Sequence, residues 1–181
     1  MKTVSTYIRS IYSPGFSSIM MWFFNTNLTL GFTPWISRDN VGFDQYDKNK
    51  FVSTSIDYEK AAALYLLATP IIEGKQNGQV KYLLQCNKQA TLLFEYKLNS
   101  DAQMRAYLTI EKQGEQIPFE FRVQQCRVKE ADGKVTVMTI QTGLGVFVKT
   151  LEAYLKAVGA DRHLSKLTEE ELGDPQASGE M

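Results

Sequence analysis

Hydrophobic and polar residues alternate along several short stretches of the chain, which is the pattern of a strand with one buried face. In residues 28–33, alternate positions hold Leu or Phe and the positions between them hold Thr or Gly, and the apolar stretch continues to Ile36. Residues 19–24 are apolar throughout, and residues 25–27 between the two stretches read Asn-Thr-Asn, a composition typical of turns. We therefore predict a β-hairpin over 19–36.

The predicted hairpin lies in a stretch without charge, residues 10–37, which also contains both tryptophans, Trp22 and Trp35. Polar residues, glycine and proline interrupt the stretch too often for a membrane-spanning helix, which needs about 20 mostly apolar residues. Because the first strand is apolar on both faces, its outer face is either covered by a second layer or a second subunit, or is an aromatic binding surface.

Five further strands are expected in the second half, near 80–86, 92–97, 104–111, 119–124 and 135–140. Turn residues separate them, including Gln113-Gly114 and Asp132-Gly133. Residues 37–49 are polar and read as an exposed loop, followed by a short strand at 50–53.

Two segments, 55–74 and 142–159, have the apolar spacing of helices. Their expected boundary residues are Thr54 or Ser55, Gly74, Thr142 and Gly159. The order of elements predicts an α+β fold with two antiparallel meandering β-sheet units, each followed by a helix, and with the helices covering one side.

Composition indicates one ordinary globular domain, with 181 residues, 44% apolar residues and 22% charged residues. The two cysteines, Cys86 and Cys126, are too few and too far apart for a disulfide framework or a zinc knuckle. We interpret them as reduced strand residues of a cytoplasmic protein.

The net charge of zero conceals an asymmetry along the chain. Residues 1–166 hold all 20 basic residues and 15 of the 20 acidic ones, a net charge of +5, whereas residues 167–181 hold five acids and no base. We predict a single α+β domain at 1–166 and a disordered acidic C-terminal tail at 167–181. A basic body with an acidic tail is typical of nucleic-acid-binding proteins, although it also fits an ordinary solvated terminus.

Candidate catalytic chemistry is sparse. The single histidine, His163, follows the second predicted helix and has no second histidine or nearby cysteine to share a metal. Gly143 and Gly145 imitate a phosphate loop, but the third glycine of that motif is missing. We therefore expect a protein that is not an enzyme and that uses no metal or cofactor.

Cations and an aromatic residue occupy many predicted outward positions of consecutive strands, a combination that binds single-stranded nucleic acid through phosphates and base stacking. Together with the two tryptophans, the candidate nucleic-acid-binding residues are Trp22, Trp35, Lys81, Lys97, Arg105, Tyr107, Lys112 and Arg122. Because Glu95, Glu111 and Glu120 lie on the same faces, a solvated face of mixed charge is the alternative.

Two strands-then-helix halves, a basic sheet and an acidic tail resemble the Whirly and positive-cofactor-four type of single-stranded-DNA-binding fold, over roughly residues 17–160. The stretch TGLGVFVKTLEAYLKAVGADRHLSKL is similar in style to phage proteins of that type. The KGKAAL signature of plant Whirly proteins is absent, so no binding residue is carried over from them. The resemblance implies a ββββα repeat, homo-oligomers, and binding of single-stranded DNA without sequence preference.

These observations predict a sequence-independent single-stranded-DNA-binding protein of phage replication or recombination, with RNA as an open alternative ligand. The expected partners are single-stranded nucleic acid, further copies of the chain, and replication or recombination proteins that the acidic tail recruits; no membrane is expected. The second hypothesis is a viral structural or protein-interaction protein, acting in assembly or as a host inhibitor, whose aromatic hairpin is a protein interface.

Overall fold

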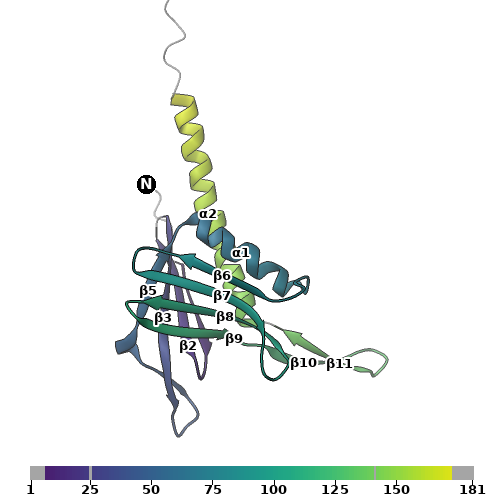
Figure 1. The fold of residues 1–181 in the computed structure, drawn as a ribbon. Coiled ribbons are helices and arrows are strands. Elements are labelled where there is room, and N and C mark those ends of the chain that lie inside the picture. The colour runs from purple at the N-terminus through teal and green to yellow at the C-terminus, as the bar shows by residue number, and fades with distance from the viewer. Residues whose placement is uncertain (1–6, 25, 141, 173–181) are drawn as a thin grey trace, which may run out of the picture.

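The computed structural model describes residues 7–24, 26–140 and 142–172. Its first half is an antiparallel five-stranded sheet in which β1, β2 and β3 follow one another, and in which β4 and β5 pair with different parts of β3 (Figure 1). The bounds are β1 (Tyr7–Ser13), β2 (Ser17–Phe24), β3 (Asn27–Arg38), β4 (Asp44–Tyr46) and β5 (Val52–Ile56). A 3-10 turn, Lys48–Lys50, joins β4 to β5, and helix α1 (Tyr58–Ile72) follows.

The second half begins with a four-stranded antiparallel meander. Its strands are β6 (Val80–Gln85), β7 (Ala90–Leu98), β8 (Met104–Lys112) and β9 (Glu115–Phe121). A separate two-stranded ribbon of β10 (Gln124–Lys129) and β11 (Val135–Ile140) comes next, and the long helix α2 (Thr142–Leu172) follows it. The chain is therefore α+β with antiparallel sheets and two helices, as predicted, but the finer ββββα repeat is not confirmed.

The predicted hairpin is confirmed, since β2 pairs with β3 in a register that places Met21 opposite Leu30 and Met20 opposite Gly31. The predicted alternation of buried and outer positions along β3 is also confirmed, because Leu28, Leu30 and Phe32 are fully buried. The turns at Gln113-Gly114 and Asp132-Gly133 are likewise found between β8 and β9 and between β10 and β11.

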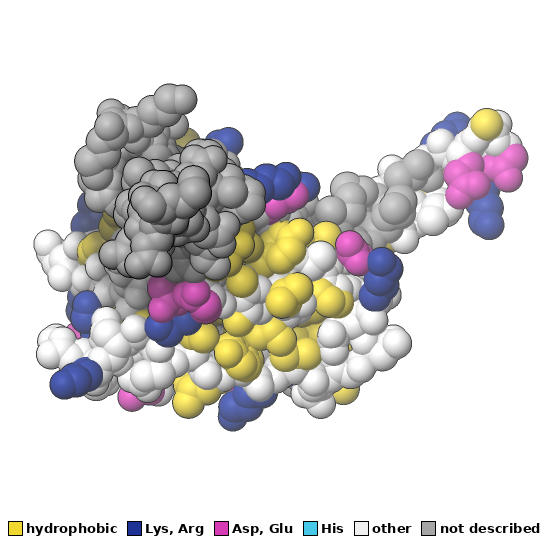
Figure 2. Space-filling view, turned by 90° about the horizontal axis from the view of Figure 1, so that it is seen from above, with side chains coloured by type: hydrophobic (Ala, Val, Ile, Leu, Met, Phe, Trp, Pro, Cys, Tyr) yellow, Lys and Arg dark blue, Asp and Glu magenta, His cyan; other side chains and the backbone are white. Residues whose placement is uncertain are grey.

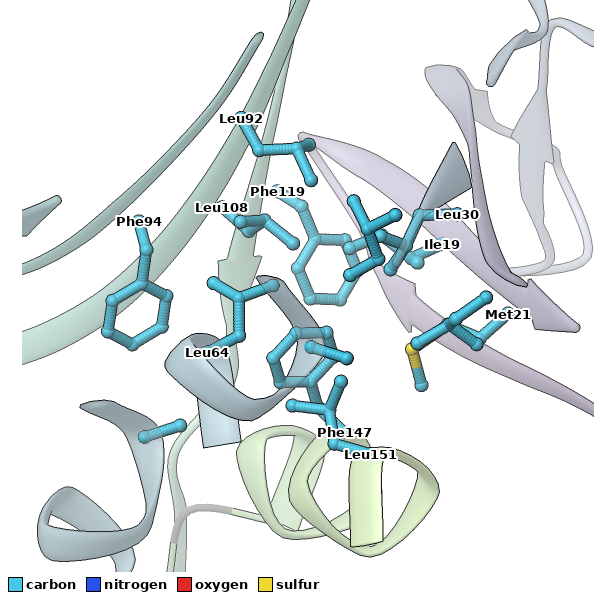
Figure 3. Packing of buried hydrophobic residues seen from close by; sticks show 14 of the residues in the cluster. Ile19, Met21, Leu30, Leu64, Leu92, Phe94, Leu108, Phe119, Phe147 and Leu151 are labelled. Carbon is cyan, nitrogen blue, oxygen red and sulfur yellow. The ribbon is translucent and has the colours of Figure 1, made fainter. Parts of the chain in front are cut away.

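One hydrophobic core joins both sheets and both helices. Strands of the first sheet run across those of the second, and the inner faces of both sheets turn toward the helices (Figures 1 and 3). Figure 3 shows Phe119 and Leu108 from the second sheet and Ile19 from the first pointing at the same interior as Phe147 of α2. All four side chains are fully buried, so both sheets and α2 share one interior.

Hydrogen bonds from side chains to backbone carbonyl groups also join the sheets. Three side chains donate to carbonyl oxygens of the other sheet's unit: Ser17 Oγ to Pro118 (2.7 Å), Lys112 Nζ to Ser53 (2.7 Å) and Arg122 Nη2 to Pro14 (2.7 Å).

The start of α1 differs from the prediction. Thr54 and Ser55 belong to β5, where their backbone pairs with β3, so neither is free to cap the helix. Asp57 is the cap instead, and its carboxylate accepts from the backbone N–H of Lys60 (3.0 Å). The end is as predicted, with Gly74 in the left-handed conformation (φ 68°) one residue beyond the C-cap.

The predicted end of the second helix at Gly159 is wrong. Helix α2 continues to Leu172 and is about 46 Å long. One glycine inside a helix costs only about 1 kcal/mol, and the residues after it are mostly good helix formers. Gly159 lies where the helices meet, with the Tyr58 hydroxyl 3.5 Å from the place a Cβ would take. His163 thus lies within the helix, as do residues 167–172 of the predicted tail; residues 173–181 lie outside the described part.

Two elements of the first half were not anticipated. Strand β1 pairs with β2 along its whole length, although only the hairpin beyond it was predicted. The predicted loop at 37–49 is largely structured, since β3 continues to Arg38 and turns back into β4. Asp39 closes that turn by accepting from the backbone N–H groups of Val41 (3.0 Å) and Phe43 (2.8 Å).

Candidate nucleic-acid interface

The outer face of the first sheet carries aromatic and small polar side chains. Strand register fixes this face, because Trp22 lies opposite Thr29, and Met20 lies opposite Gly31, on the side away from the core. Two serines of β5, Ser53 and Ser55, continue the same rows across β3. The face is therefore uncharged across its centre, which matches the chargeless stretch in the sequence.

Phe51 lies on this face directly over Gly31. A Cβ built on Gly31 would be 2.4 Å from two ring carbons of Phe51 and 3.0 Å from the ring of Trp22, so only glycine allows the ring to come this close. The rings of Phe51 and Trp22 are stacked, with centroids 6.3 Å apart and planes inclined by 23°. Phe51 nevertheless keeps 41% of its surface exposed, so an aromatic platform faces solvent.

Beside this platform is a groove of about 420 Å³. Its lining residues are Ser10, Tyr12, Ser18, Met20, Thr33, Tyr46, Lys48 and Phe51. Tyr12 is 61% exposed and rests against Tyr46, with ring centroids 5.7 Å apart. The groove therefore presents aromatic surface from Tyr12 and Phe51, hydroxyl groups, and one charged residue, the cation Lys48.

Tyr46 is held in place by its surroundings and by β4. Burial raises the pKa of Tyr46, and its hydroxyl oxygen is buried without a hydrogen-bond partner among the described residues. Two residues before Tyr46 on β4, Asp44 accepts a hydrogen bond from the indole N–H of Trp35 (3.0 Å), which lowers the pKa of that carboxyl. Trp35 is thus bound to β4, and its cross-strand partner Tyr46 lines the groove.

Two more lysines, Lys50 and Lys112, lie on the other side of Phe51. A second hollow of about 360 Å³ shares Phe51 with the groove and is lined by Asn49, Lys50, Phe51, Val52, Ser53, Lys112, Gln113 and Glu115. The two hollows together hold three lysines, Lys48, Lys50 and Lys112, and one acid, Glu115. The electrostatic balance along them therefore favours an anion.

The structure brings together Lys81, Lys97, Arg105 and Tyr107 on the outer face of the second sheet, as the alternation predicts. Acids on the same face engage most of these groups. Lys97 lies 3.2 Å from Glu95, and Arg105 forms ion pairs with Glu120 (3.4 Å) and Asp101. Tyr107 is buried and donates to Glu120 (3.0 Å). This face has the mixed charge of the alternative reading.

Lys112 and Arg122 do not belong to that outer face. Lys112 has the same strand phase as the buried Ile110, and its ammonium group reaches Ser53 in the first sheet. Arg122 follows β9 and donates to Pro14. Both cations therefore lie where the two sheets meet, and the strand phase of Lys112 in the sequence already indicated the inner side of β8.

The sequence did not single out Tyr12, Tyr46, Lys48 or Phe51. Their roles arise from long-range pairing, since β4 and β5 both return to β3 and bring these residues next to β1 and β2. The available signal was Gly31, because a glycine inside a strand often marks a close approach of another group.

Alanine at position 31 should disturb the platform without unfolding the sheet. The new Cβ would push the flexible ring of Phe51 aside, so near-ultraviolet circular dichroism should change and oligonucleotide binding should weaken severalfold. Gly145→Ala in α2 is the matched control, since nothing lies within 4 Å of its Cβ position. An unchanged affinity of Gly31→Ala beside an altered aromatic spectrum would show that Phe51 is not used.

Among the described residues, no helix has the length and apolar character needed to cross a membrane, and no cluster of three or more His, Cys, Asp or Glu side chains is arranged for a metal ion. Comparison of the chain with family models, with curated proteins and with solved structures finds no match.

Proposed function

We propose that this protein binds single-stranded nucleic acid, DNA in the first place, without sequence preference, on the outer face of its first sheet. The observation that carries the proposal is the groove lined by Tyr12 and Phe51 together with Ser and Thr hydroxyls and Lys48. The ring of Phe51 stacks on Trp22, and Lys50 lines the second hollow beside it. Bases stack on such rings whatever their identity, and lysines follow the phosphates.

The location of this site refines the expectation from the sequence. Trp22 belongs to the stack and Trp35 pairs with Tyr46 at the groove, so both tryptophans remain part of the proposed interface. Lys112 joins it through the second hollow. The cations of the second sheet are less suitable as phosphate ligands, because neighbouring carboxylates already neutralise Lys97 and Arg105.

A Whirly-like architecture and a role in phage replication or recombination remain parts of this proposal, supported by the resemblance and by the antiparallel α+β fold. The second candidate is a protein-interaction role in viral assembly or host inhibition. The same aromatic groove supports it, since exposed aromatic residues are also typical of protein interfaces. The lysines beside Phe51 favour nucleic acid over this second reading.

The proposal is tested by titrating a fluorescent oligothymidylate at several salt concentrations. For single strands, the logarithm of the affinity should fall linearly with the logarithm of salt, and each phosphate-binding lysine contributes about 0.7 to the slope. Removing both cations in Lys48→Ala/Lys50→Ala should therefore reduce the slope by about 1.4. Lys75→Ala/Lys88→Ala, at exposed positions elsewhere, is the matched control. A flat salt response of the wild type would refute the proposal.

The acidic C-terminal end should compete with nucleic acid for the lysines. Removal of residues 168–181 deletes five acids and no base, so it should strengthen single-strand binding at low salt. The gain should shrink as salt rises, because screening shortens the range of the charges. Removal of residues 173–181 alone deletes two of the acids and should give a smaller gain. Unchanged or weaker binding by both truncated forms would mean that the end does not compete.

A further inference from the structure

The ribbon of β10 and β11 stands away from the rest of the molecule. Figure 1 shows it leaving the body beyond the end of β9, and Figure 2 shows it as an arm that extends past the hydrophobic side chains on the face bearing α1. Each of its strands has six residues, so the arm is about 20 Å long. A two-stranded ribbon without a covering layer is marginally stable alone, which suggests that another surface supports it.

One face of this arm is both basic and apolar. The register places Arg127 opposite Val137 and Lys129 opposite Val135, and directly opposite residues share a face. Both valines are 55% exposed, although Val is mostly a core residue. Lysine or arginine beside each valine gives a compact surface of two cations and two branched apolar side chains. Acids of the arm, Glu130 and Asp132, are in its turn, where their side chains bond to Thr136 and to the backbone of Lys134.

A surface of complementary character lies on the outer face of the second sheet. A hollow of about 350 Å³ crosses the sheet, with Leu83, Leu93 and Pro118 forming its apolar row. Leu83 is 65% exposed, on the edge strand β6. The remaining lining residues are Thr91, Glu95, Thr109, Glu111 and Gln116. Its two charged lining residues are acids: Glu95, which also pairs with Lys97 (3.2 Å), and Glu111, which accepts a hydrogen bond from Gln116 (3.1 Å). The two charged residues of the arm face are bases.

We propose that the arm of one copy docks, by the face carrying Arg127, Lys129, Val135 and Val137, onto this acidic apolar hollow of a second copy. The valines cover Leu83 and Leu93, and the cations lie beside Glu95 and Glu111. Opposite charges in register fix the orientation of such a contact, and burial of the exposed apolar groups stabilises it.

The observations favour a second copy over nucleic acid as the occupant of the arm face. Phosphates would pair with the cations but leave both valines in water. The hollow offers apolar side chains for the valines and carboxylates for the cations. The arm also points away from its own body, which makes the contact intermolecular (Figure 1). This interface is separate from the groove of the first sheet and does not rest on the proposed nucleic-acid binding.

Paired charge reversal gives the test. One variant reverses the arm, Arg127→Glu/Lys129→Glu, and the other reverses the hollow, Glu95→Lys/Glu111→Lys. The mass of each full-length protein is followed by sedimentation velocity over a range of concentrations, with thermal melts to confirm folding. Lys149→Glu/Lys156→Glu, on exposed positions of α2, has the same change of charge as the arm variant and serves as its control. Val137→Lys is a second arm variant that keeps Arg127 and Lys129.

The wild type and the control should self-associate, while each reversed variant and Val137→Lys should associate about tenfold or more weakly. An equimolar mixture of the two reversed variants should associate again, because each arm then meets a hollow of opposite charge. A monomeric wild type at every concentration would overturn the proposal. Arm variants that keep the wild-type mass would also overturn it, and if they lose oligonucleotide binding the arm contacts nucleic acid instead. A further variant, Leu66→Glu, changes an exposed leucine of α1 (69% exposed). Dissociation by Leu66→Glu but not by the arm variants would place the self-association on α1 and overturn the proposal.

Discussion

Phe51→Ala should bind a single-stranded oligonucleotide about 5- to 150-fold more weakly than the wild type, because stacking on one aromatic ring contributes about 1–3 kcal/mol per base. The stack on Trp22 and the position over Gly31 fix the ring before any ligand arrives, so little ordering cost opposes its use. Tyr12→Ala should show a loss in the same range, since Tyr12 forms the opposite wall of the groove. Fluorescence anisotropy at one fixed salt concentration measures both.

Phe43→Ala is the control for these variants. Phe43 is also an exposed ring, but it lies in the turn between β3 and β4 and does not line the groove. Its loss should leave the affinity unchanged. Equal losses for Phe43→Ala and Phe51→Ala would indicate non-specific contact with exposed rings and would remove the groove as the site.

Phe147→Ala should have the largest effect on stability. Phe147 is fully buried where α2 meets both sheets. The centroid of its ring lies 5.1 Å from the ring centroid of Phe121. Truncation of a buried Phe costs about 3–5 kcal/mol, a large part of the roughly 5–15 kcal/mol that stabilises a typical domain. The melting temperature should therefore fall by about 6–20 °C for a chain of this size.

The neighbouring substitution Val146→Ala provides the comparison, because Val146 is on the exposed side of the same helical turn. It should change the melting temperature by little, since alanine is the better helix former and no cavity is created. A small effect of Phe147→Ala in the same melts would mean that α2 does not hold the two sheets in one core.

Period-two alternation was enough to predict much of the fold. Leu28, Leu30 and Phe32 are buried as expected, and so are Phe119 and Phe121 in the second sheet. Element ends were less predictable, because they depend on partners that are distant in sequence. Pairing of β5 with β3 moved the cap of α1 to Asp57, and Gly159 proved too weak a signal to stop α2.

Much less of the candidate site could be predicted. The uncharged stretch around Trp22 pointed to an aromatic face, and strand phase alone could have removed Lys112 from the outer face. The ion pairs of Lys97 and Arg105 depend on cross-strand neighbours, which alternation indicates only in part. Phe51 contacts Gly31 only because β5 pairs with β3, and no local sequence pattern predicts that long-range pairing.

Photocrosslinking of the wild-type protein to an oligonucleotide that contains 5-iodouracil tests the proposed interface most directly, because the crosslink forms with aromatic side chains in contact with the base. Trypsin separates the relevant segments well, since residues 10–38 form one peptide with Tyr12 and Trp22, and residues 51–60 form another with Phe51. We expect crosslinks in these two peptides, and none when the oligonucleotide is supplied as a duplex. Crosslinks confined to the second-sheet peptides 82–88 and 106–112, or equal crosslinking of duplex and single strand, would contradict single-strand binding by the first sheet.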